Sequence, residues 1–209
     1  MSSFYNDIVG KNLNRLAGLS DGIFAFAMTL LVLDLHVPAR AAIHSESELW
    51  AALVVLGPRF VPYVMSFLTL GIFWVGQQAQ LNVLARSNRD FAWLHLAFLL
   101  TVTLMPFSTA LLSEFLLYRI VLLIYWGNIV ALGGMLFASW KYAERAGLVK
   151  PEVTPAQRGA LDRRIIYAQA LYAFGVALCV FNTYWSIGFI VAVQLQYAIA
   201  PKFRPFSWL

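Results

Sequence analysis

The sequence predicts an all-α integral membrane protein, built as a bundle of six transmembrane helices. Of its 209 residues, 61% are hydrophobic and only 12% are charged, whereas soluble domains average roughly 45–50% apolar and about 25% charged residues. The apolar residues also gather into six runs of about 20 residues, the length that a helix needs to cross a hydrocarbon core roughly 30 Å thick. Because backbone groups in lipid must bond within their own helix, short connections between such runs favour an antiparallel bundle.

The predicted spans belong to a single domain that covers residues 1–209. They are residues 17–37, 52–82, 91–112, 115–141, 162–181 and 184–200. The second has the least defined start, because Pro58 either opens a helix or kinks a longer one, and Arg59 beside it can extend its charge to the membrane surface. In the third span Pro106 interrupts the helix, and Ser108 and Thr109 can bond the carbonyls that it frees.

The first run has an alternative interpretation as a cleaved signal peptide. Lys11 and Arg15 precede the apolar run, and residues 39–41 resemble a cleavage site. Asp21 and Asp34 bracket the run, however, and the rest of the chain crosses the membrane repeatedly. An uncleaved first helix is therefore the simpler prediction.

The distribution of basic residues predicts the orientation of the bundle. Six antiparallel spans place 12 of the 15 Lys and Arg residues on one side and 3 on the other. The smaller group consists of Arg40, Arg59 and Arg119, and the larger group includes Lys11, Lys202 and Arg204 near the two termini. The positive-inside rule then puts both termini in the cytoplasm of a multi-pass protein of the cell membrane. Because these residues form no continuous basic stripe, we expect no nucleic-acid partner.

The stretch from Arg15 to Asp34 contains the chief candidate site. When its residues are plotted at 100° each, one helix face collects Gly22, Phe26, Leu30 and Leu33, with Thr29 on its flank. Asp21 lies close to this face, just inside the span. An ionisable residue at membrane depth costs about 2.5 to 3.5 kcal/mol on insertion scales, which makes Asp21 a candidate functional residue.

Three helices bring polar residues to the same membrane level as Asp21. These residues are Arg15, Ser20 and Asp21 in the first span, Trp74, Gln77 and Gln78 in the second, and His95 in the third. The simplest interpretation is structural: Arg15 pairs with Asp21, and the layer fixes the base of the first helix against its neighbours. Transfer of protons or other ions through the layer is the alternative.

Several function classes lack the residues that they require. The chain has no Gly-rich phosphate loop, no His-Glu-x-x-His and no Gly-x-Ser-x-Gly, so the sequence does not predict an enzyme. The single cysteine, Cys179, excludes a disulfide within the chain and a cysteine-based metal site. We therefore expect no catalytic residues, no metal site and no cofactor.

The pattern Arg15-x-x-x-Leu-Ser-Asp-Gly22 resembles that of the transmembrane protein 175 family of potassium channels, in its short prokaryotic form with one six-helix unit. Tyr63-x-x-Ser-Phe67, Trp74 and Pro106-Phe-x-Thr109 extend the resemblance. It implies a homotetramer in the lipid bilayer whose four first helices line a central pore without a selectivity-filter loop. K⁺ and other monovalent cations are then the conducted ions.

The resemblance also implies roles for individual residues. Family positions place the narrowest part of the pore at Phe26, Leu30 and Leu33, with Thr29 and Gly22 flanking it. The family's polar network falls on Arg15, Ser20, Asp21, Trp74, Gln77 and His95.

Four residues depart from the family pattern. Leu19 replaces the usual Phe, and Phe26 stands where Ile or Leu is usual, so four rings would narrow the closed pore. Gln77 stands where the family has His, and His95 where it has Asn. The two positions have thus exchanged the imidazole for an amide while keeping one imidazole at the same level.

The leading hypothesis is a potassium-preferring cation channel that conducts through a hydrophobic constriction on the first helix, gated by dewetting. A proton-coupled secondary transporter is the alternative suggested by Asp21, Gln77 and His95 at one depth, although the paired repeats and broken midplane helices of transporters are not evident. A membrane scaffold protein that conducts nothing is the third hypothesis.

Overall fold

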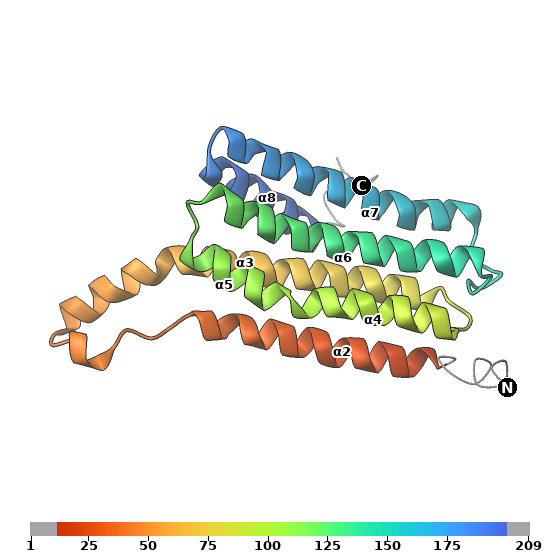
Figure 1. Cartoon of the computed structure of the whole chain (residues 1–209), viewed down its shortest axis with the longest axis horizontal. Coiled ribbons are helices and arrows are strands. Elements are labelled where there is room, and N and C mark those ends of the chain that lie inside the picture. The colour runs from red at the N-terminus through yellow and green to blue at the C-terminus, as the bar shows by residue number, and fades with distance from the viewer. Residues whose placement is uncertain (1–11, 200–209) are drawn as a thin grey trace.

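The computed structural model describes residues 12–199, and in this part of the chain helices cross the molecule six times (Figure 1). The helices are α2 (Leu13–Leu30), η1 (Leu31–Asp34), η2 (Arg40–Ala42), α3 (Glu46–Asn82), α4 (Arg89–Thr103), α5 (Met105–Glu114), α6 (Arg119–Arg145), α7 (Pro155–Ala177), η3 (Leu178–Val180) and α8 (Thr183–Ile199). α4 and α5 together make the third crossing. The predicted helical bundle is confirmed.

Five of the crossings are long and apolar enough to traverse a membrane, judged by length and composition. α8 makes the sixth crossing with 17 residues, which correspond to about 26 Å of helix. The predicted terminal segments 1–11 and 200–209 lie outside the described residues, and so do Lys11, Lys202 and Arg204.

Most helix ends differ from the predicted spans, and at the starts of α2 and α7 a capping side chain accounts for the difference. α2 begins at Leu13 rather than at residue 17, since the side chain of Asn12 accepts a bond from Arg15 N at 3.2 Å. Residues 142–161, which lie between the fourth and fifth predicted spans, are partly helical, because α6 continues to Arg145 and α7 already begins at Pro155. A capping box between Thr154 and Gln157 fixes that start.

α3 is one helix of 37 residues that continues through Pro58 and Pro62. At 1.5 Å per residue it is about 55 Å long, well above the thickness of a hydrocarbon core. Its first turns project beyond the other helices at the left of Figure 1. Of the two interpretations of Pro58, the longer helix is therefore correct. Arg59 pairs with Glu114 at 2.8 Å, and both side chains are partly exposed.

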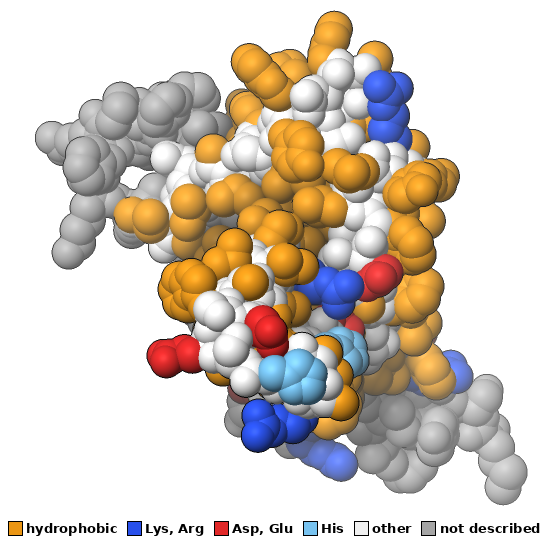
Figure 2. Space-filling view, turned by 90° about the vertical axis from the view of Figure 1, so that its left-hand side faces the viewer, with side chains coloured by type: hydrophobic (Ala, Val, Ile, Leu, Met, Phe, Trp, Pro, Cys, Tyr) orange, Lys and Arg blue, Asp and Glu red, His pale blue; other side chains and the backbone are white. Residues whose placement is uncertain are grey.

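The projecting end of the molecule has a mixed surface. Figure 2 looks onto this end, where acidic, basic and histidine side chains lie close together and apolar side chains cover much of the surrounding surface. Large exposed apolar residues occur along α3, α6 and α8, among them Trp50, Ile120 and Trp185. Exposed apolar flanks are what a bundle surrounded by lipid presents.

The core divides into two clusters of buried side chains. The larger cluster fills the middle of the bundle around Phe24, Met65, Leu122 and Tyr125. The smaller cluster surrounds Trp140 at the end of the bundle away from the projecting turns of α3. At that end the α3–α4 and α6–α7 loops are joined by two backbone bonds, Ala85 N to Leu148 O at 2.8 Å and Lys150 N to Val83 O at 3.0 Å. The loops thereby hold the ends of four helices together.

The third crossing breaks at Leu104, directly before Met105 and Pro106, as the sequence predicts. Because Pro106 has no N–H, the carbonyl of Val102 loses its helical hydrogen bond. The hydroxyls of Ser108 and Thr109 do not replace that bond. Thr109 Oγ1 and Ser108 Oγ instead donate to the carbonyl of Met105, at 2.7 and 3.1 Å. The backbone N–H of Leu104 donates to the carbonyl of Val102 instead.

Gly133 is the glycine of α6 that permits a close approach within the protomer. A Cβ there would collide with the side chain of Gln169 on α7, whose Nε2 donates to Ile129 O at 3.3 Å. A Cβ at Gly127 or Gly134 would meet nothing within 4 Å. Gly133 therefore has a packing role between α6 and α7, whereas Gly127 and Gly134 have space for a methyl group among the described residues.

We expect Gly133→Ala to lower the free energy of unfolding by about 1–3 kcal/mol, the usual cost of overpacking. The added methyl displaces Gln169 and breaks its bond to α6. Gly134→Ala is the matched control, because it adds the same group to an open position and alanine favours helix by up to about 1 kcal/mol. Denaturation of the detergent-solubilised variants measures both, and equal effects would contradict the contact.

Candidate functional site

α2 continues directly into η1, which contains Leu31 and Leu33, and this first crossing, named after α2 below, has one face packed into the bundle and one face left open. Leu16, Ser20, Phe24, Ala27 and Leu31 are buried, and they recur every three or four residues, as one face of a helix requires. They pack against α3 and α4.

The opposite face carries three of the predicted pore residues. Phe26 is 66% exposed and Leu33 is 65% exposed. Gly22 is exposed between these and the polar end of the helix, and a Cβ there would meet no atom within 4 Å. Within one protomer, the described residues leave this apolar face uncovered.

Leu30 lies to the side of that face. It is half-buried and lines a groove of about 220 Å³ with Phe26, Thr103 and Pro106. Thr29 is exposed, and its Oγ1 donates to the backbone carbonyl of Phe26 at 2.8 Å. The structure thus brings Phe26 and Leu33 together on the open face and turns Leu30 partly towards α4 and α5.

The buried side of α2 is anchored by a polar cluster around Ser20. Its Oγ donates to Leu16 O at 2.9 Å, accepts from Gln77 Nε2 at 3.1 Å, and lies 2.7 Å from His95 Nε2. All three side chains are at most 2% exposed. The cluster therefore joins α2 to α3 and α4, which is the structural role predicted for the polar layer.

The bonding of Ser20 fixes the direction of its bond with His95. A hydroxyl has one proton, and Ser20 gives it to the carbonyl of Leu16. Nε2 of His95 must therefore carry a hydrogen and donate to Ser20. The imidazole lies between the rings of Phe91 and Phe98, with centroid distances of 6.0 and 6.2 Å.

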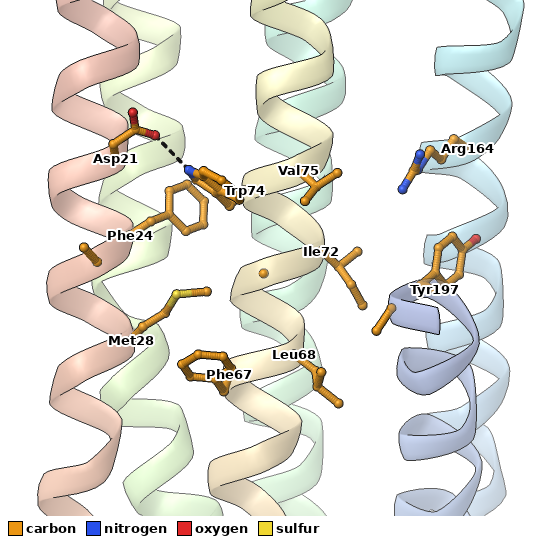
Figure 3. Close-up of a pocket in the computed structure, with 13 residues that line it drawn as sticks. Asp21, Phe24, Met28, Phe67, Leu68, Ile72, Trp74, Val75, Arg164 and Tyr197 are labelled. Atoms are coloured by element: carbon orange, nitrogen blue, oxygen red, sulfur yellow. Dashed lines mark hydrogen bonds between the residues drawn. The ribbon is translucent and has the colours of Figure 1, made fainter. Parts of the chain in front are cut away.

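Asp21 forms a second, more exposed cluster on the neighbouring side of α2. Its Oδ1 accepts from Trp74 Nε1 at 2.8 Å, the bond drawn in Figure 3, and from Gln78 Nε2 at 3.1 Å. The predicted ion pair with Arg15 is wrong for the protomer, because the exposed Arg15 side chain forms no ion pair with any described residue. Two neutral donors from α3 replace it.

Gln78 belongs to the polar layer predicted from the sequence, but the network that the family resemblance implies does not include it. Its spacing from Trp74 could have predicted this contact, since residues i and i+4 share a helix face and Gln78 lies four positions after Trp74. Spacing alone could not select it over Gln77, which points into the bundle instead.

A further buried network was not predicted at all. Gln194 Nε2 donates to Thr69 Oγ1 at 2.7 Å, and Thr69 lies 3.3 Å from the hydroxyl of Tyr125. Ser66 Oγ lies 3.2 Å from the same Tyr125 hydroxyl and 2.6 Å from Thr109 Oγ1. These contacts link α3, α5, α6 and α8, so they rigidify the bundle behind α2.

The described residues hold no group of three or more His, Cys, Asp or Glu side chains that could bind a metal ion. The polar groups near α2 are instead isolated hydrogen-bond clusters in an apolar surrounding. Their chemistry suits positioning of a helix and attraction of a cation.

Known proteins resemble the chain in sequence and in fold. The family model described as "Endosomal/lysosomal potassium channel TMEM175" matches residues 15–106, which include α2 and its polar partners on α3 and α4. A potassium channel of Streptomyces collinus is 33% identical over 193 residues, covering 90% of this chain and 84% of that protein. A potassium channel of Chamaesiphon minutus is 28% identical over 189 residues, covering 88% and 93%.

A solved structure shares the whole architecture. The crystal structure of a lysosomal potassium-selective channel TMEM175 homologue from Chamaesiphon minutus superposes with a TM-score of 0.76 at 26% identity, covering 90% of this chain and 96% of that one. The arrangement of helices described above is therefore that of a known multi-pass membrane protein. Because the match to the family model is joined by a Streptomyces collinus relative that is 33% identical and covered over 84% of its length, this chain belongs to the TMEM175 family of ion channels.

Proposed function

We propose that this chain forms a potassium-preferring cation channel of the cell membrane, in which four copies surround a pore lined by α2. Its relatives in Chamaesiphon minutus and Streptomyces collinus are potassium channels, which supports this proposal. Family membership also argues for transport rather than catalysis. K⁺ is the conducted ion, and no cofactor takes part.

The open face of α2 is the observation that carries the proposal. One side of the helix is buried and bonded through Ser20, whereas Phe26 and Leu33 on the other side are 66% and 65% exposed. A helix fixed so firmly to its own bundle presents its free face at a defined angle. Four such faces around an axis form a narrow, apolar channel.

An apolar constriction of this kind gates by excluding water. Where side chains offer no hydrogen bonds and the passage is narrow, water leaves and hydrated cations cannot follow. Phe26, Leu30 and Leu33 form this constriction, with Thr29 and Gly22 beside it. Phe26 closes it more tightly than an aliphatic residue would, because its ring is larger.

Asp21 gives one entrance of the pore a negative charge. It lies five residues before Phe26, about 7.5 Å along the helix axis, and both of its hydrogen bonds are made by neutral donors. Asp21 forms no ion pair with any described residue, so a basic side chain of the described protomer does not compete for its carboxylate, which attracts cations to the constriction. In the proposed orientation this entrance faces the cytoplasm, together with both termini and the Lys/Arg-rich loops.

Ion flux from reconstituted vesicles tests the function. We expect protein-containing liposomes to release K⁺ down its gradient faster than Na⁺, and Leu30→Ala to change the rate. Absence of cation flux from a well-folded oligomer would contradict the channel and favour a scaffold role. Saturable flux that requires a counter-ion gradient would favour the proton-coupled transporter.

A further inference from the structure

A groove in the wall of the bundle has the properties of a lipid site. It measures about 760 Å³ and lies along α3, between α2 on one side and α7 and α8 on the other. Its lining is mainly apolar, with Phe67, Leu68, Ile72 and Val75 contributed by α3 (Figure 3). It opens on the outside of the described protomer.

Arg164 of α7 and Tyr197 of α8 line this groove near the bundle end at which α3 and α8 terminate. Arg164 is exposed and forms no ion pair with any described residue. Asp21 is the one carboxylate in the lining, and it lies across α3 from Arg164, bonded to Trp74 (Figure 3). The cation at this end of the groove is therefore available for an anion.

A smaller cavity of about 40 Å³ adjoins the same two residues. Besides Arg164, its lining contains four buried polar atoms without a partner among the described residues: Gln80 Nε2, Gln169 Oε1, Tyr172 Oη and Tyr197 Oη. Gln80 is 4% exposed and Tyr172 1% exposed. Three of the four atoms are hydrogen-bond donors, and unpaired buried donors cost free energy.

These features point to one ligand. We propose that the groove binds an anionic phospholipid, with an acyl chain along Phe67, Leu68 and Val75 and the phosphate between Arg164 and Tyr197. The cavity behind them is large enough for water, which connects the phosphate to Gln80 and Tyr172. The groove borders α2 on the side of Asp21 and Met28 and does not include Phe26 or Leu33 of the open face. The proposal does not require that the protein conducts.

Two other occupants fit the groove less well. The segment 200–209 directly follows α8, but its side-chain charges are Lys202 and Arg204, which repel Arg164. A second copy of the chain could fill an apolar groove, but acceptors on its helical backbone are already bonded within their own helices, whereas a phosphate brings free ones. A phosphate supplies oxygen acceptors and a negative charge together.

Native mass spectrometry of the delipidated full-length protein tests the proposal. We expect phosphatidylglycerol to be retained in preference to phosphatidylcholine with the same acyl chains. Arg164→Gln should lower the retention of phosphatidylglycerol about fivefold, the contribution of one basic residue near an anionic lipid, and Tyr197→Phe should lower it less. The control is Arg163→Gln, which removes the neighbouring charge outside the groove and should leave retention unchanged.

Two further measurements identify the occupant. Val75→Trp should fill the groove and lower the retention of both lipids, whereas glycerol 3-phosphate, which lacks acyl chains, should not compete. Equal retention by wild type and Arg164→Gln, or full competition by glycerol 3-phosphate, would overturn the proposal. A change of oligomeric state in Val75→Trp with unchanged lipid retention would overturn it in favour of a second copy.

Discussion

Phe26→Ala is expected to raise K⁺ efflux from proteoliposomes about tenfold, which corresponds to a barrier lower by roughly 1.4 kcal/mol. Phe26 is 66% exposed on the open face of α2, so in the proposed tetramer four rings surround the axis. Replacing each ring by a methyl group widens the passage and lets water remain in it. Hydrated cations then cross without the cost of leaving water.

Phe107→Ala is the control for this experiment. Phe107 is 65% exposed, as much as Phe26, but it lies on α5 rather than on α2. Its truncation removes the same apolar area from another surface and should leave efflux unchanged. A similar increase in both variants would mean that loss of packing, and not a wider pore, causes the leak. Unchanged efflux in Phe26→Ala would place the constriction elsewhere.

Ser20→Ala is expected to lower the free energy of unfolding by about 2 kcal/mol, within the range for leaving a buried polar group unpaired. The change removes the acceptor of both Gln77 Nε2 and His95 Nε2, two donors that are buried between three helices. It removes almost no volume, so packing losses add little. Chemical denaturation in detergent, followed by circular dichroism, measures the change.

Ser113→Ala provides the matched comparison. The hydroxyl of Ser113 is also buried, but it has no hydrogen-bond partner among the described residues. Its removal relieves an unpaired group, so stability should stay the same or rise slightly. Similar losses in both variants would show that the Ser20 cluster contributes nothing beyond the packing of a small side chain.

The sequence by itself determined the class of fold and the number of crossings. Lipid leaves few alternatives, because an apolar run of about 20 residues must form a helix that satisfies its own backbone. The break before Pro106 was also predicted from the sequence, but Pro58 and Pro62 likewise lack an N–H and stay inside α3, so a missing N–H does not by itself determine a break. The open face of α2 followed from helical periodicity, which placed Phe26 and Leu33 on the same side.

Helix ends were predicted less well, because they depend on single side chains within one turn. Asn12 lengthens α2, and Thr154 with Gln157 starts α7 between two predicted spans. Hydropathy does not register such caps, since they are polar residues at the edge of an apolar run.

Only the tertiary structure decided which polar groups meet. Asp21 bonds Trp74 and Gln78, more than 50 residues away, rather than nearby Arg15, and Gln194 reaches Thr69 across 125 positions of the chain. A helix pattern gives the depth and the face of a side chain, but its partner depends on how neighbouring helices rotate and approach. That choice is made by the packing of the whole bundle, which no single span contains.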